Sequence, residues 1–173
     1  MAVLASNFRR EMEAPRFPLL ITLLVPLLAI FLQAYLPLRF PRLDIFNLPL
    51  LITVYFAITR RSPVIGTLTG ASIGLIQDGV THRPFGINGI ANTIIGFLAA
   101  SIGVKIDVDN TAARLFLLFG FTLLYSFLYL LIVHRLMAFD LRWTWRHEVI
   151  KAAVNAVLGV LLFALLDRTR RLD

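Results

Sequence analysis

The sequence predicts an all-α membrane protein that crosses the bilayer several times. Hydrophobic residues make up 58% of the chain and charged residues only 16%, with a mean hydropathy of +0.81. Apolar runs of about 20 residues recur from Phe17 almost to the C-terminus, as expected of membrane-spanning helices. Basic residues gather at the ends of these runs, where they fix the orientation of a membrane protein.

We expect six spans joined by short connections, at about residues 17–38, 45–59, 63–80, 85–104, 112–133 and 149–166. The first run exceeds the roughly 7–15 apolar residues of a signal peptide, so we expect it to be retained. The second run covers only ~22 Å, less than the ~30 Å of a hydrocarbon core. This short length predicts either a thinner membrane or a helix shielded by its neighbours.

The third run reaches ~27 Å only when Gln77 and Asp78 are counted in it. The longest connection, at about residues 134–148, carries Trp143 and Trp145 among arginines. Tryptophan beside arginine is typical of a segment at the level of the lipid headgroups. We therefore expect a short interfacial element there and a single transmembrane domain overall.

The distribution of basic residues predicts the orientation. With six spans both termini share one side, and ten of the 17 Lys and Arg residues fall on that side. We expect a cytoplasmic N-terminal tail (residues 1–16), a transmembrane domain (17–166) and a cytoplasmic C-terminal tail (167–173). Asp78 then lies at the outer face. Because the basic residues flank the spans, the net charge of +7 does not indicate a nucleic-acid partner.

The third run carries small residues at strict four-residue spacing, namely Gly66, Gly70 and Gly74, followed by Asp78. On a helix these residues share one narrow stripe, which allows another helix to approach closely. We expect the glycines to form a helix-packing or partner-binding face. A carboxylate on such a stripe needs a partner, water or a cavity. If Asp78 only closes a helix contact, Asp78→Asn should be nearly silent. If its charge matters, the substitution should impair function while the protein level stays normal.

Amide side chains recur on other spans with the same spacing. They allow two interpretations, either hydrogen bonds between packed helices or a polar cavity that opens outward. The candidates for the rim of that cavity are Gln77, Asp78, Asn88, Asn92 and Asn155, with Lys151 as a further candidate.

Catalysis finds little support in the sequence. The absence of cysteine excludes disulfides, thiolate metal sites and cysteine nucleophiles. Asp78 has no second acid within the spans, and the histidines match no standard zinc spacing. We therefore expect a protein that is not an enzyme and that holds no metal or cofactor.

Four motifs carry a resemblance to a known family: residues 47–49 (Asn-Leu-Pro), 60–63 (Arg-Arg-Ser-Pro), 66–78 (the glycine stripe and Asp78) and 84–88 (Pro-Phe-Gly-Ile-Asn). Together they resemble the MreD family of bacterial rod shape-determining proteins. Span number and spacing agree over nearly the whole chain, and the distinctive motifs lie within about residues 45–100. The chain departs from the family pattern at His82-Arg83 and at His147 and Lys151.

The resemblance implies a non-enzymatic scaffold subunit of the machinery that builds lateral peptidoglycan, in the bacterial inner membrane. Expected partners are a bitopic MreC-like protein, the RodA–class B penicillin-binding transpeptidase pair and, indirectly, MreB. The fold is then similar to the substrate-binding subunits of energy-coupling-factor vitamin transporters, which are six-helix bundles with an outward cavity. Gln77 and Asp78 match the family's motif.

A vitamin-binding subunit of such a transporter is the alternative function. In those subunits a small-xxx-small patch on the first span docks the coupling partner. Ala29 and Ala34 in this chain are five residues apart and lack that spacing. This departure argues against the transporter.

Overall fold

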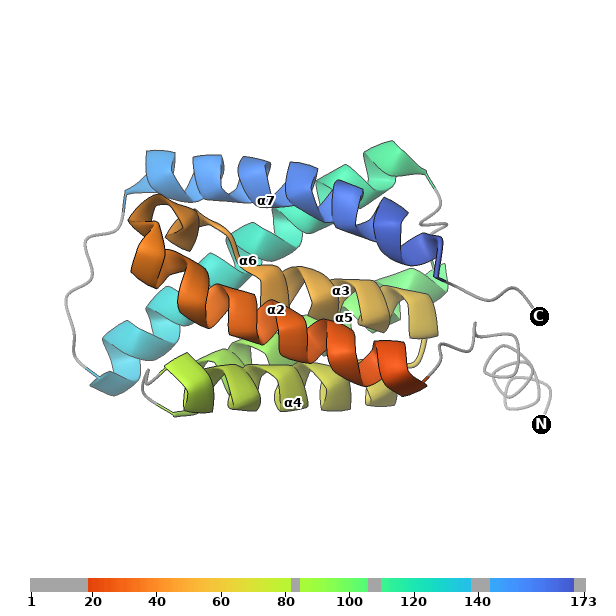
Figure 1. Ribbon diagram of the computed structural model, residues 1–173, viewed down its shortest axis with the longest axis horizontal. Coiled ribbons are helices and arrows are strands. Elements are labelled where there is room, and N and C mark those ends of the chain that lie inside the picture. The colour runs from red at the N-terminus through yellow and green to blue at the C-terminus, as the bar shows by residue number, and fades with distance from the viewer. Residues whose placement is uncertain (1–18, 82–84, 106–109, 138–143, 170–173) are drawn as a thin grey trace.

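The computed structural model describes residues 19–81, 85–105, 110–137 and 144–169. Within these ranges the chain is helical and has no strand, which confirms the all-α class (Figure 1). The elements are α2 (Leu19–Arg39), the 3-10 helix η1 (Pro41–Ile45), α3 (Leu48–Arg60), α4 (Pro63–Thr81), α5 (Ile87–Lys105), α6 (Thr111–Met137) and α7 (Trp145–Asp167).

The long helices run along one axis, so the bundle has two ends (Figure 1). We call the end where α2 begins and α7 ends the terminal end. The opposite end, where α2 and α4 end and α5 and α7 begin, is called the cavity end.

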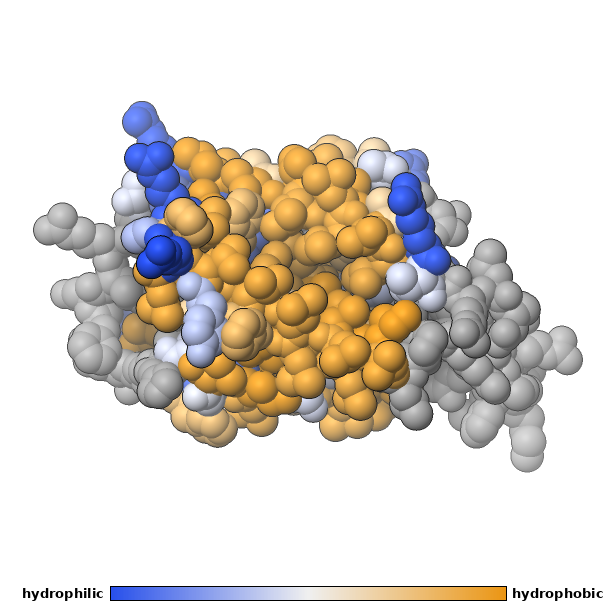
Figure 2. All heavy atoms as spheres, viewed as in Figure 1, coloured by the Kyte–Doolittle hydropathy of each residue, from blue (hydrophilic) through white to orange (hydrophobic). Residues whose placement is uncertain are grey.

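Five segments are long and apolar enough to cross a membrane: Leu20–Arg39, Pro41–Arg60, Ile87–Lys105, Thr111–Arg135 and Trp145–Asp167. Figure 2 shows a face that is hydrophobic across its middle, with hydrophilic side chains toward both ends. This arrangement fits a protein embedded in a bilayer and supports a multi-pass membrane protein. Helix α4 is not among the five, because glycine, threonine, Gln77 and Asp78 lower its hydropathy.

Helix α3 lies at the centre of the bundle, packed against α2, α4 and α5. Every residue from Pro49 to Thr59 is buried. The helix begins at Asn47, whose Oδ1 accepts a hydrogen bond from the Leu50 amide, and ends at Arg61 in the left-handed conformation. Neighbouring helices thus shield this short helix. Of the two explanations for its length, a thinner membrane or shielding by neighbours, the structure agrees with the second.

Helix α2 lies on the outside of the bundle, in front of α3 in the view of Figure 1, and contacts α3 and α4. Only 17% of its apolar window is buried, the lowest share among the five candidate spans. Its leucines are exposed instead, including Leu23 at 63% and Leu27 at 49%. A row of exposed leucines on a helix of this kind is suited to contact with lipid or with another transmembrane helix.

The connection between the last two helices is shorter than the sequence predicts. Helix α6 continues to Met137 and α7 begins at Trp145, so both extend past their apolar runs into polar residues. The predicted interfacial element at 134–148 is therefore helical at both its ends, and Trp143 lies outside the described residues. The N-terminal tail, His82 and Arg83, and residues 170–173 also lie outside them.

Candidate functional site

The glycine stripe of α4 is packed against α5 of the same chain. A methyl group at Gly70 would lie 2.7 Å from the carbonyl carbon of Asn92, and one at Gly74 would lie 2.6 Å from that of Asn88. Gly66 meets the α5 backbone in the same way, one turn earlier on α4. Real Cβ atoms essentially never come this close to another heavy atom. The stripe is a helix-packing face, and α5 leaves no room on it for a partner's helix.

Asp78 ties the end of α4 to the start of α5. Its Oδ2 accepts hydrogen bonds from the amides of Gly86 (2.9 Å) and Gly89 (3.1 Å), and its Oδ1 accepts one from the amide of Asn88 (3.2 Å). Amides at the start of a helix have no partner within the helix, so the carboxylate acts as a cap. Gly86 has a φ of +102°, a conformation that favours glycine.

The cap changes the expectation for Asp78→Asn. An asparagine has a single acceptor oxygen, whereas both carboxylate oxygens of Asp78 accept bonds. The substitution would turn an NH2 group toward at least one backbone N–H. We therefore expect Asp78→Asn to lower the stability of the contact between α4 and α5.

A cavity of about 300 Å³ lies at the cavity end, among α2, α4, α6, α7 and the segment around η1. Its polar lining comes from Gln33, Asp44, Asn47, Gln77, Tyr125 and Lys151, among other residues. Helix α2 adds an apolar edge formed by Ala34, Pro37 and Leu38. A concave site with a few convergent polar groups and an apolar edge is the usual form of a small-ligand site.

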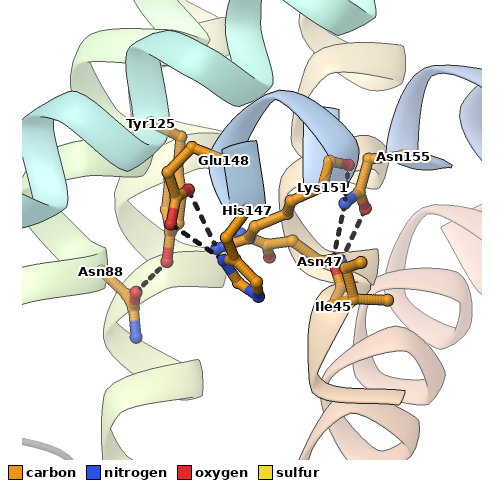
Figure 3. A network of polar contacts seen from close by, with 8 residues as sticks. All are labelled: Ile45, Asn47, Asn88, Tyr125, His147, Glu148, Lys151 and Asn155. Atoms are coloured by element: carbon orange, nitrogen blue, oxygen red, sulfur yellow. Dashed lines mark hydrogen bonds and ion pairs between the residues drawn. The ribbon is translucent and has the colours of Figure 1, made fainter. Parts of the chain in front are cut away.

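The predicted rim residues divide into a lining and a layer behind it. Gln77 lines the cavity, whereas Asn88 and Asn92 stand behind the wall and are fully buried. Asn88 Oδ1 accepts a hydrogen bond from the Tyr125 hydroxyl (Figure 3), and Asn92 Nδ2 donates to Gln77 Oε1 at 3.5 Å. Each asparagine thus supports a residue of the lining. Asp78 is 1% exposed and does not line the cavity.

Asn155 holds the opposite wall in place (Figure 3). Its Oδ1 accepts a hydrogen bond from the Asn47 amide at 2.8 Å, and its Nδ2 donates to the carbonyl oxygens of Ile45 and Lys151, both at 2.8 Å. Lys151 itself lines the cavity. Of the five residues predicted for the rim, only Gln77 lines the cavity, and the other four make hydrogen bonds to neighbouring segments.

Comparison with known protein families decides the identity of the chain. The family model for rod shape-determining protein MreD matches residues 15–169. The chain belongs to the MreD family. No curated protein and no solved structure matches it. The MreD resemblance is thus confirmed and makes this a rod-shape membrane protein, whereas the likeness to vitamin-transporter subunits has no support.

Sequence reasoning missed part of the wall in this MreD-family chain. The predicted rim omits Gln33, Asp44 and Asn47, all of which line the cavity. An amide in the first apolar run was the available signal for Gln33, because polar residues within a span generally face the protein interior. Asp44 and Asn47 lie near the start of α3, where the sequence alone suggests a turn residue and a helix cap and gives no sign of a cavity.

The terminal end of the bundle is held by a different set of contacts. Arg114 on α6 forms a 2.6 Å ion pair with Asp167 on α7, and the Tyr55 hydroxyl of α3 donates to the other oxygen of Asp167 at 3.1 Å. Among the described residues no group of three or more His, Asp or Glu side chains is placed to hold a metal ion.

Proposed function

We propose that this protein is a non-enzymatic scaffold of the bacterial rod-shape machinery, which supports lateral peptidoglycan synthesis. The observation that carries the proposal is the family match over residues 15–169. In this proposal it binds an MreC-like bitopic protein, works beside RodA and a class B penicillin-binding transpeptidase, and connects to MreB indirectly.

The proposed location is the inner membrane, with six passes and both termini in the cytoplasm. Helix α4 would be the sixth crossing, because its 19 residues extend about 28 Å and pair with α5 through the glycine stripe. Its outer face carries Val64 and Leu68, exposed at 69% and 62%, as contact with lipid requires. The excess of Lys and Arg on the terminal side supports the orientation.

We place the docking face for the partner's transmembrane helix on α2. The glycine stripe is filled by α5, so close approach must occur elsewhere. Helix α2 is the least buried candidate span and exposes leucines along its length. Helices associate in lipid by van der Waals packing, and the exposed leucines of α2 provide a surface that another helix can pack against.

Co-purification with the MreC-like partner tests both the scaffold function and the docking face on α2. Leu23→Trp and Leu27→Trp add bulk to the exposed face of α2, and Val157→Trp and Leu161→Trp add the same bulk to an exposed face of α7. We expect the α2 variants to lose partner by about tenfold, equivalent to about 1.4 kcal/mol, and the α7 variants to retain it. Equal losses would contradict docking on α2. A wild-type protein that captures no partner would contradict the scaffold itself.

A further inference from the structure

Two asparagines on α5 have side-chain amides that the protein bonds at one end only. Asn88 is bonded through Oδ1 to the Tyr125 hydroxyl (Figure 3), and Asn92 is bonded through Nδ2 to Gln77. Among the described residues, Asn88 Nδ2 and Asn92 Oδ1 are buried side-chain atoms without a hydrogen-bond partner. Both asparagines are 0% exposed. Buried polar atoms in native proteins generally have a partner, so each of these two atoms needs an explanation.

The number of unpartnered atoms does not depend on how the amides are oriented. The oxygen and nitrogen of a side-chain amide are assigned from their hydrogen bonds, and the Tyr125 hydroxyl and the Gln77 amide can each donate or accept. Turning an asparagine amide over exchanges its bonded atom with its unpartnered atom. In either orientation each asparagine keeps one unpartnered atom, and a group that both donates and accepts satisfies it.

Both asparagines are joined to the cavity through one side chain. Gln77, the partner of Asn92, lines the cavity, and so does Tyr125, the partner of Asn88. The lipid around the bundle has no hydrogen-bonding groups at the depth of the hydrocarbon, and a polar group buried without a partner costs free energy. The cavity is therefore the side from which a small polar molecule can reach the two amides.

We propose that an ordered water molecule binds between Asn88 and Asn92 and is supplied from the cavity. Water both donates and accepts, so it fits either orientation of the two amides. The asparagines are four residues apart on one helix, where Cβ atoms lie about 5–6 Å apart, so one water can bond to both. An acyl chain has no polar atom and would leave both amides unsatisfied. The water site extends the polar interior to Asn92, about 8 Å along α5 from its first residue.

A high-resolution structure of the full-length protein in a lipid nanodisc tests this proposal. We expect a water peak within hydrogen-bond distance of both Asn88 and Asn92. Asn155 is the matched control in the same map, because it is also 0% exposed but is bonded by protein groups at both ends of its amide. No water is expected at its side chain. A map that resolves water in the cavity but none at Asn88 and Asn92 would overturn the proposal.

Radiolytic labelling of the same protein gives a second test, because hydroxyl radicals formed from water modify the side chains beside it. Asn92→Leu removes both polar atoms of one amide at similar size and leaves the bond between Asn88 and Tyr125 in place. We expect this variant to lower the labelling of Tyr125 severalfold. Phe121, one turn away on α6, is 5% exposed against 4% for Tyr125, and its labelling should stay as in wild type. Unchanged labelling of Tyr125 in the folded variant would mean that Tyr125 meets cavity water alone, which contradicts the proposal. The water site does not rest on the scaffold function.

Discussion

The α4–α5 contact and the cavity beside α2 both contain polar side chains, but these side chains have different surroundings. Between α4 and α5 the backbones are in contact at each glycine of the stripe. The Asp78 carboxylate there accepts hydrogen bonds from three backbone amides of its own chain. Around the cavity, by contrast, Gln33, Asn47 and Gln77 line an open space, and along α2 leucines lie exposed. A polar or small residue inside a membrane protein is thus structural where its own chain supplies the partner atoms. It becomes a candidate for binding where the chain does not.

The largest effect is expected when a side chain is enlarged on the glycine stripe. Gly70→Ala would place a methyl group against the Asn92 backbone, and neither helix can move without disturbing the other contacts of the stripe. We expect a loss of about 3 kcal/mol or more in the free energy of unfolding. Mixed-micelle denaturation of the isolated protein measures it.

Gly120→Ala on α6 is the control, because no atom lies within 4 Å of the added methyl group. Alanine favours a helix over glycine by about 1 kcal/mol, so this variant should be as stable as wild type or more so. Equal losses for both glycine variants would mean that helix-backbone effects, not the contact, set the result.

A smaller loss is expected at the wall of the cavity. Asn155→Ala removes the partner of the Asn47 amide and of the Ile45 and Lys151 carbonyls. Leaving such groups unsatisfied costs about 1–3 kcal/mol. Ser101→Ala, which removes only a bond within one helix turn near the surface, should change stability by much less. If the two variants unfolded alike, Asn155 would not support the wall.

The smallest effect belongs to the terminal end. The Arg114–Asp167 pair has side chains 14% and 29% exposed, so solvent screens part of its interaction. We expect Arg114→Gln to lower the free energy of unfolding by about 1 kcal/mol or less. Because salt weakens exposed ion pairs, the difference from wild type should shrink when unfolding is measured in higher salt. A large loss that salt does not change would argue for a buried pair instead.

Much of the architecture could be predicted because it is encoded locally. Apolar runs located the helices, and four-residue spacing identified the buried face of α4, since both depend only on helix periodicity. The role of Asp78 could not be predicted, because the amides that it caps are presented by the turn into α5. The wall of the cavity could not be predicted either, because it depends on contacts between segments far apart in the sequence. Its bond between Asn47 and Asn155 joins residues 108 positions apart.

The central claim is that Asp78 caps α5 and is not part of the cavity. The most direct test is Asp78→Asn, with unfolding measured on the purified protein. We predict a loss of about 1–3 kcal/mol in the free energy of unfolding, because at least one backbone amide loses its acceptor. Unchanged stability would contradict the claim.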